Sequence, residues 1–268
     1  MELAPAVADT LDHIRRQAPL VHNIINYVAM DVAANALLAV GASPVMAHAL
    51  DEMRDFVAIA GALTVNIGTL SPPWVEAMLV ATAAAGELGK PWALDPVGVG
   101  ATPYRTTVAR ELAARRPTVI RGNASEILVL AGDAATSTKG VDSTRGVDEA
   151  RDAARALAAN ARCTVAVTGA VDYVTDGTTA FTVANGHPMM TKVTALGCTA
   201  TALIGACLAV GTAPAPAAAH ALAILGVCGE IAARGAEGPG SFRMRLIDAL
   251  HQIDGNTLRR TARVHSAA

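Results

Sequence analysis

Three side chains of this chain have the chemistry that phosphoryl transfer requires. Asp95 and Arg121 come directly after short apolar runs of strand length, and Glu126 follows Arg121 by five residues. Carboxylates bind Mg²⁺, and a guanidinium balances the charge on phosphate oxygens. Because ligands bind beyond the carboxyl ends of strands in open α/β sheets, we expect these side chains to meet at one edge of a sheet. Their types and placement favour a phosphoryl-transfer site.

A polar stretch, 190–198, leads into an Ala-rich, uncharged helix predicted over 199–210. We expect Gly197 to make a tight turn onto the start of this helix. A helix N-terminus has unpaired N–H groups and about half a positive charge, so it binds anions. Cys198 is then placed where a thiolate would be stabilised. The alternative is a buried core cysteine at the start of a helix of small residues.

The other site residues also have structural interpretations. Asn123 and Glu126 have the spacing of a capping box at a helix start. Asp95 precedes a proline and suits a turn, and Arg121 suits a solvated surface. No residue among them is specific alone, and their joint placement is the stronger signal. Polar or glycine residues also stand at two further predicted strand ends: residues 66–68 at one, and Thr168 and Gly169 at the other.

The elements that would position these residues alternate between strands and helices. We predict strands at 43–47, 63–67, 91–94, 118–120 and 163–167, and a hairpin of strands at 172–175 and 179–183. We predict helices at 6–16, 28–40, 102–116, 124–131 and 147–161. Another helix is capped by Asp51 and ended by Gly61, and one more starts at 71. Further helices follow 198, 216 and 241. This alternation is typical of a mostly parallel sheet with helices on both faces.

Composition indicates a single α/β domain over 1–268, with a polar surface excursion at 132–146 and a loose tail after about 254. Hydrophobic residues make up 52% and aromatic residues only 3%, so alanine, valine and leucine must supply the core. The formal net charge of −2 gives no electrostatic reason to expect nucleic acid or an anionic membrane as partner. Four cysteines without metal-type spacing fit a reducing compartment, and we expect a cytoplasmic protein.

One long stretch could be mistaken for a membrane span. Residues 193–229 contain no Asp, Glu, Lys or Arg. Gly211, Pro214 and Pro216 divide this stretch, and a spanning helix needs roughly 20 continuous apolar residues. We therefore predict two buried helices.

Six motifs give the chain a specific resemblance. They are PLVHNIINY at 19–27, ALLAVGASPVM at 36–46, NIGTL at 66–70, LDPVG at 94–98, RGNASE at 121–126 and TKVTALGC at 191–198. Through them the chain resembles the hydroxyethylthiazole kinase family, thiamine-salvage members of the ribokinase-like superfamily, over nearly its whole length. The resemblance implies a ribokinase-like fold and Mg²⁺-assisted, ATP-dependent phosphorylation of the primary alcohol of 5-(2-hydroxyethyl)-4-methylthiazole. It also implies a homotrimer with thiazole sites between subunits.

Roles follow from the resemblance by motif. The residues expected to line the thiazole pocket are Asn26, Met46, Gly68 and Ala195. ATP is expected to contact Arg121 and Thr168, and the metal and phosphates to be served by Asp95 and Glu126. The anion hole and the catalytic position are assigned to Gly197 and Cys198.

Two departures from the family pattern accompany the resemblance. The family usually has glycine where this chain has Ala195, which would crowd the substrate unless only the backbone is used there. It usually has Thr-Asn where this chain has Ile25-Asn26, so one hydroxyl beside the pocket is missing. Both departures concern substrate affinity more than the type of reaction.

Two other readings of the function remain. One is another ribokinase-like enzyme, a hydroxymethylpyrimidine kinase or an ATP-dependent NAD(P)H-hydrate dehydratase. Many such relatives have aspartate where this chain has Cys198, which argues against them. The other is a non-catalytic binding protein on a decayed kinase scaffold, which the intact Asp95, Glu126, Arg121 and Gly197 argue against.

Overall fold

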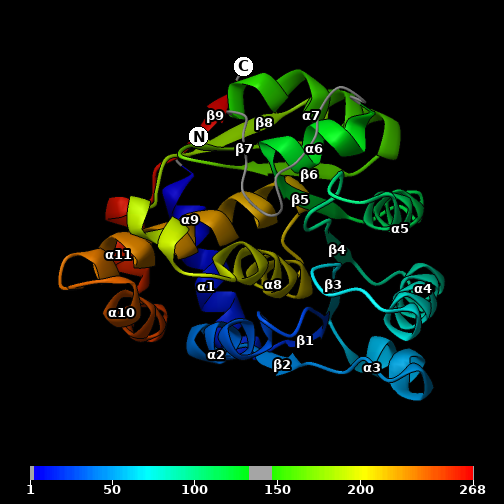
Figure 1. The fold of residues 1–268 in the computed structure, drawn as a ribbon. Helices are drawn as coiled ribbons and strands as arrows, with labels where there is room; N and C mark the ends of the chain where they lie inside the picture. Colours follow the sequence, from blue (N-terminus) through cyan, green and yellow to red (C-terminus); the bar gives the residue numbers. More distant parts are fainter. Residues whose placement is uncertain (1–2, 133–146, 268) are drawn as a thin grey trace.

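Within residues 3–132 and 147–267, which the computed structural model describes, nine strands form one sheet (Figure 1). Their order across the sheet is β2-β1-β3-β4-β5-β6-β7-β8-β9. The strands are β1 Leu20–Ile24, β2 Ser43–Val45, β3 Ala62–Asn66, β4 Trp92–Asp95, β5 Val119–Asn123, β6 Thr164–Thr168, β7 Asp172–Thr175, β8 Ala180–Val183 and β9 Val264–Ala267. Strands β1 to β6 run parallel to one another, whereas β7, β8 and β9 pair antiparallel.

Helices cover both faces of this sheet, each over its own hydrophobic core (Figure 1). One face carries α1 Ala4–Gln17, α2 Met30–Val40, α8 Leu196–Ala209, α9 Pro214–Ala233, α10 Pro239–Gln252 and α11 Gly255–Thr261. The other carries α3 Met53–Ile59, α4 Pro72–Glu87, α5 Pro103–Ala113, α6 Ala124–Ala131 and α7 Val147–Ala161. Two 3₁₀ turns, η1 Leu50–Glu52 and η2 Pro188–Lys192, complete the connections. The predicted α/β architecture is confirmed.

The central strands β3 and β4 are buried on both faces, which is why they consist of largely apolar runs without alternation. All five residues of β3 are buried, as are all four of β4. The polar residues Asn66 and Asp95 end these two strands, so they enter the buried edge of the sheet together. The strand ends therefore provide a protected setting for the site.

Helices α8 and α9 are the two buried helices that the sequence predicts. Among the described residues, α9 is the one helix long and apolar enough to cross a membrane, and most of it is buried inside the protein. It begins at Pro214 rather than after Pro216. Both prolines lie in its first turn, where a missing N–H costs no intrahelical hydrogen bond.

The structure corrects the expectation of a loose tail after about 254. Asp254 caps α11 by accepting a hydrogen bond from the Thr257 N–H, and β9 pairs with β8 as the last strand of the sheet. Arg263 also donates to the carboxylate of Glu230 on α9, which ties this segment to the core face. These contacts join residues far apart in the chain, so the local sequence does not signal them.

A second correction concerns Asp51. The sequence predicts it as the cap of one helix, but it lies inside η1, and Glu52 holds the N-cap position of α3. The excursion predicted at 132–146 lies outside the described residues, apart from Gly132, which ends α6 in the left-handed conformation.

Candidate active site

The predicted site residues lie along the carboxyl edge of the parallel strands. Those assigned to the alcohol and those assigned to ATP come from different strands. Met46 follows the edge strand β2, Asn26 follows β1, and Gly68 follows β3. The central strands end in Asp95 on β4 and in the segment from Arg121 on β5, and Thr168 ends β6. The residues expected to bind the alcohol thus occupy one half of the edge, and those expected to bind ATP the other.

Asp95 lies at the middle of this edge and is fully buried. Its Oδ2 accepts hydrogen bonds from Asn66 Nδ2 at 2.8 Å and from Thr201 Oγ1 at 3.0 Å. Its Oδ1 has no hydrogen-bond partner among the described residues and lies 3.6 Å from Arg121 Nη1. Burial raises the pKa of Asp95, although Arg121 and the hydrogen bonds lower it. One carboxylate oxygen therefore remains available to a ligand.

Arg121 is held inside the site, not solvated on the surface, because its side chain is only 12% exposed. Its Nη2 donates to Thr168 Oγ1, which joins two of the residues predicted to contact ATP. Its guanidinium also lies directly against Gly197, where an added Cβ would come within 2.5 Å of Nη1. A side chain at position 197 would therefore displace the guanidinium from the first turn of α8.

Asn26 and Asn66 connect the substrate half of the edge to Cys198. Asn26 Nδ2 donates to Asn66 Oδ1 at 2.8 Å and lies 3.4 Å from Cys198 Sγ. The Gly68 N–H donates to the same Asn66 oxygen at 2.9 Å. A Cβ on Gly68 would lie 2.6 Å from Asn26 Nδ2, so the backbone packs directly on that side chain. The four residues form one buried polar network.

Cys198 is not the stabilised thiolate that its helix position predicts. Burial is the main cause that raises the pKa of its thiol, to about 12, and the neighbouring negative charge of Asp95 raises it further. Arg121 lowers this pKa by less. The desolvation cost of a buried anion exceeds the favourable interactions with Arg121, Asn26 and Asn66, so the thiol is neutral near pH 7.

Glu126 is both a helix cap and a neighbour of the charged centre. It forms the predicted capping box with Asn123: its Oε2 accepts from the Asn123 N–H at 2.8 Å, and its own N–H donates to Asn123 Oδ1. Its Oε1 accepts from the Gly98 N–H at 2.8 Å. Burial, and then the charge of Asp95, raise the pKa of Glu126 to about 7. The capping interpretation is correct, and it leaves the carboxylate close to Asp95.

Helix α8 starts earlier than predicted, and the turn onto it is made by Ala195, not by Gly197. The helix begins at Leu196, so Gly197 and Cys198 lie within its first turn. The residue in the left-handed conformation is Ala195, with φ of 69°, and its side chain offers no hydrogen-bond acceptor to the helix. The first-turn N–H groups are thus free of a side-chain cap, as an anion site requires. Positive φ also accounts physically for a glycine preference at this position.

Met46 lies at the outer end of the site. It is half-buried against the core under α8 and α9, and it follows the edge strand β2, which pairs with β1 alone. Two further residues were missed from the sequence. Thr201 lies one turn after Cys198, so the i, i+3 spacing places it on the same helix face above Asp95. Arg105 donates to backbone carbonyls beside Gly68, and no local pattern signals that contact.

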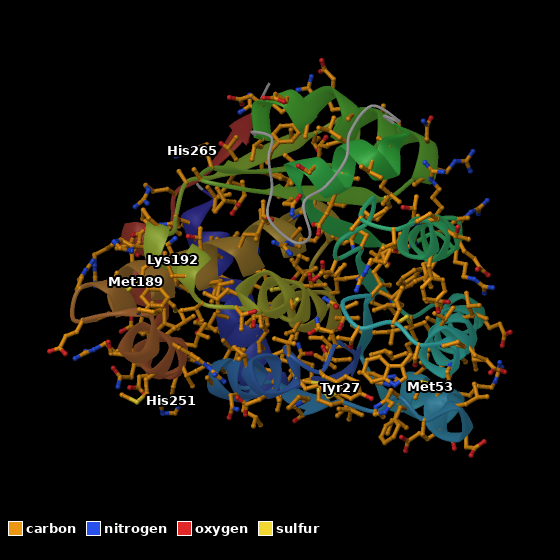
Figure 2. The ribbon with its side chains drawn as sticks, viewed as in Figure 1. Tyr27, Met53, Met189, Lys192, His251 and His265 are labelled. Carbon is orange, nitrogen blue, oxygen red and sulfur yellow. The ribbon has the colours of Figure 1, made fainter. Side chains whose placement is uncertain are left out.

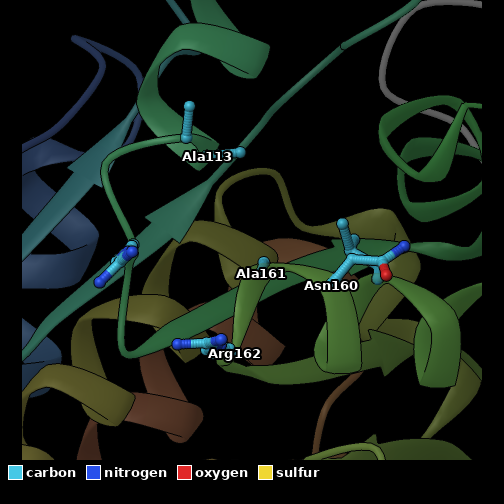
Figure 3. Close-up of a pocket in the computed structure, with 7 residues that line it drawn as sticks. Ala113, Asn160, Ala161 and Arg162 are labelled. Atoms are coloured by element: carbon cyan, nitrogen blue, oxygen red, sulfur yellow. The ribbon is translucent and has the colours of Figure 1, made fainter.

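A cavity of about 420 Å³ lies away from these residues, at the opposite edge of the sheet (Figure 3). Its lining includes Ala113 and Ala161, the last residues of α5 and α7. In a parallel sheet the helices run back against the strands, so their ends meet the amino edge. The cavity therefore contains none of the predicted site residues.

Comparison with known proteins gives a consistent result over almost the whole chain. Residues 11–256 match the family model described as the hydroxyethylthiazole kinase family. The hydroxyethylthiazole kinase of Cereibacter sphaeroides is 54% identical over 96% of this chain and 97% of its own length. That of Nitratidesulfovibrio vulgaris is 51% identical over 95% of both chains.

Solved structures agree. The hydroxyethylthiazole kinase protein from Pyrococcus horikoshii superposes with a TM-score of 0.91 at 44% identity, over 98% of this chain and 99% of that one. The pyridoxal kinase from Staphylococcus aureus superposes with a TM-score of 0.59 at 16% identity, over 80% of this chain and 88% of that one, a likeness of fold alone.

Proposed function

Because this chain belongs to the hydroxyethylthiazole kinase family, we propose that it transfers the γ-phosphoryl group of ATP to the primary alcohol of 5-(2-hydroxyethyl)-4-methylthiazole. The observation that carries this proposal is the 54% identity over 96% of the chain to a relative of that name. The buried Asp95 and the half-buried Arg121 and Cys198 at the carboxyl edge support it, because phosphoryl transfer depends on positioned charges.

The order of the residues along the edge supports their proposed roles. Asn26, Met46, Gly68 and Ala195 would bind the thiazole, and Arg121 and Thr168 would bind ATP. The first turn of α8, with Gly197 and Cys198, lies between these two groups, against Arg121 on one side and Asn26 on the other. The transferred phosphoryl group would therefore face both the N–H groups of this turn and the guanidinium. That placement balances charge where it develops in the transition state.

Asp95 and Glu126 fit the Mg²⁺ that accompanies ATP in phosphoryl transfer. Mg²⁺ is usually held by one or two carboxylates together with substrate phosphates. Asp95 Oδ1 is a buried carboxylate oxygen without a hydrogen bond from residues 3–132 or 147–267, and Glu126 is a buried carboxylate that interacts electrostatically with Asp95. When bound, Mg²⁺ would neutralise charge on the phosphate oxygens. The protein's own part is to hold both carboxylates by backbone and side-chain donors before ATP arrives.

We also propose a homotrimer whose thiazole sites are completed by neighbouring subunits, in the cytoplasm. Five large apolar side chains are exposed on elements around the edge strand β2: Tyr27, Val28, Leu38, Leu50 and Ile59. Tyr27, labelled in Figure 2, is 66% exposed and packs on Trp74 with ring centroids 4.9 Å apart. Apolar surface beside the outer edge of β2 suits association.

The cysteines of this chain support the proposed cytoplasmic location. All four are free, which suits a reducing compartment: Cys163, Cys198, Cys207 and Cys228.

The decisive experiment is a coupled ADP-release assay with Mg-ATP and three classes of alcohol: the thiazole alcohol, hydroxymethylpyrimidine and a sugar. We expect the highest kcat/KM with the thiazole alcohol and a product heavier by one phosphoryl group in mass spectrometry. Higher kcat/KM with the pyrimidine would transfer the assignment to another ribokinase-like kinase. A protein that binds the alcohols but releases no ADP with any of them would indicate a binding protein instead.

A further inference from the structure

Arg105 connects the two loops that follow β3 and β4. It lies in the first turn of α5, and its Nη1 donates to the carbonyl oxygens of Ile67 at 2.7 Å and Val97 at 2.9 Å. Its Nη2 donates to the carbonyl oxygen of Gly68 at 2.7 Å. One guanidinium thus holds three backbone carbonyls from two loops that are about 30 residues apart in the chain.

The helix itself does not account for an arginine at this position. The first turn of a helix carries a partial positive charge, which disfavours a cation there. The cap of α5 is made by Thr102, whose Oγ1 accepts from the Arg105 N–H. The side chain is half-buried and turned to the loops, whereas Arg110 on the same helix is exposed. The contacts with the loops are therefore the physical reason for Arg105.

The inner sides of the same two loops form the proposed site. The Gly68 N–H donates to Asn66 Oδ1, and the Gly68 backbone packs on Asn26. In the second loop, the Gly98 N–H donates to Glu126 Oε1 at 2.8 Å. The carbonyls of these loops face Arg105 while neighbouring amides face the site. A loop released from Arg105 is therefore free to move away from Asn26 and Glu126.

We propose that Arg105 is a positioning residue that fixes the backbone of Gly68 in the alcohol pocket and keeps it at a fixed distance from the loop after Asp95. This inference rests on the proposed function for the identity of the substrate. Two of the three hydrogen bonds go to residues 67 and 68, so binding of the alcohol depends on Arg105 more than binding of ATP. A lysine cannot replace the arginine, because its single nitrogen could at most take the place of Nη1 between Ile67 and Val97. The carbonyl oxygen of Gly68 would lose the donor that Nη2 provides.

The kinetic test compares Arg105→Lys and Arg105→Gln with Arg110→Lys as the matched control on the same helix. We expect KM for the thiazole alcohol to rise about tenfold in both Arg105 variants. We expect KM for Mg-ATP to change by less than about threefold, and Arg110→Lys to match the parent. Unchanged KM for the alcohol, or a fall in kcat with both KM values unchanged, would overturn the proposal.

Chemical rescue separates positioning from general stability. In Arg105→Ala, millimolar methylguanidinium should lower KM for the alcohol again, whereas methylammonium should not, because only the former presents the planar fork. Equal effects of the two cations would argue against the fork and for a nonspecific charge effect.

A readout without catalysis distinguishes failure of this inference from failure of the proposed function. Amide hydrogen exchange, followed by mass spectrometry, should become faster at residues 66–69 and 97–99 in Arg105→Lys and stay unchanged in Arg110→Lys. Unchanged exchange at both loops contradicts the positioning role whether or not the parent phosphorylates the thiazole alcohol. An inactive parent with the expected exchange pattern would contradict only the proposed function.

Discussion

At the residue scale, the charges of the site converge on Asp95. It is fully buried, pairs with Arg121 at 3.6 Å, and accepts from Asn66 and Thr201 through one oxygen only. A buried carboxylate is costly unless it is paired, and here the pairing partner is itself a proposed phosphate ligand. Its second oxygen has no hydrogen bond within the part of the chain that the structure describes, which is the state expected of a group that receives a ligand later in the reaction.

We expect Asp95→Asn and Glu126→Gln each to lower kcat about 100-fold or more while the fold is retained, since each removes a negative charge from the proposed metal site. Steady-state ADP release measures the first effect and circular dichroism the second. Glu126 is also part of a capping box, and loss of a cap alone costs about 1 kcal/mol of stability. Normal turnover in Glu126→Gln would leave it with the capping role only.

The neutral thiol of Cys198 leads to a second prediction at this scale. With a pKa raised to about 12, it is not a base near pH 7, and a loose transition state needs little deprotonation of the alcohol until late. We expect Cys198→Ala to retain measurable turnover. Cys198→Asp should match or exceed the parent, because a second carboxylate beside Asp95 has a raised pKa and can accept a proton.

The measurement is kcat for the parent and both Cys198 variants at saturating thiazole alcohol and Mg-ATP. If both variants are inactive although they fold and bind ATP, the thiol is an obligatory group and the prediction is wrong.

At the element scale, the start of α8 stores backbone strain at Ala195. A non-glycine residue in the left-handed region costs about 1 kcal/mol or more. We therefore expect Ala195→Gly to increase the free energy of unfolding by up to about 1 kcal/mol, after the entropic cost of glycine is subtracted. Ala156→Gly is the control, since Ala156 is exposed within α7, and it should lose about 1 kcal/mol. Urea unfolding measures both, and a destabilised Ala195→Gly would contradict the strain.

The packing of α1 on α9 gives a pH-dependent prediction. His220 is buried and its Nδ1 lies 2.8 Å from Thr10 Oγ1, which itself donates to the Ala6 carbonyl. Because the Thr10 hydroxyl donates to Ala6, Nδ1 of His220 donates to Thr10. Burial lowers the pKa of His220 to about 4, although the charge of Asp9 raises it.

Since the unfolded chain takes up this proton at higher pH than the folded one, the contribution of His220 to stability is full above about pH 6.5 and is lost as the pH falls toward 4. Its size is at most about 3 kcal/mol. The quantity to measure is the difference in unfolding free energy between the parent and His220→Gln at several pH values. This difference isolates the histidine from Glu126 and Asp172, whose pKa values are raised to about 7 and which act in the opposite direction. A difference that stays constant from pH 7 to 4 would contradict the assignment.

At the scale of the whole molecule, one surface distinguishes itself by exposed apolar side chains. Leu38 on α2 is 59% exposed and Ile59 at the end of α3 is 67% exposed, on either side of the edge strand β2. The alcohol half of the site lies next to this surface, because Met46 follows β2. An association through β2 would therefore cover the apolar side chains and enclose the substrate at once.

We expect light scattering at micromolar concentration to give the mass of a trimer. Leu38→Glu should lower that mass and raise KM for the alcohol, because a charge in an apolar interface is left unpaired. Val171→Glu is the control, since Val171 is 42% exposed but lies beyond β6, away from β2. A parent that is monomeric and fully active would rule out the proposed shared site.

Much of the fold follows from local sequence, for physical reasons that particular residues illustrate. Apolar runs that end in Asn66, Asp95 and Arg121 form consecutive parallel strands, so their ends converge without any knowledge of packing. The limits of α6 agree with the prediction residue by residue, because Asn123 and Glu126 form a capping box at its start and Gly132 ends it in the left-handed conformation.

The remainder depended on contacts that no local pattern contains. Ala195 adopts positive φ because the chain must turn onto α8 there. An alanine in the sequence does not predict that conformation, whereas a glycine would. The neutral state of the Cys198 thiol follows from its burial beside Asp95, which only the packed helix creates. Strand β9 and the reach of Arg105 to Ile67 and Gly68 join segments distant in the chain. Sequence alone determined strands β2 to β8 and the polar residues at the ends of the parallel ones, because these are properties of short segments. Tertiary structure alone decided protonation, backbone strain and the partners of each side chain, because these depend on what is buried against what.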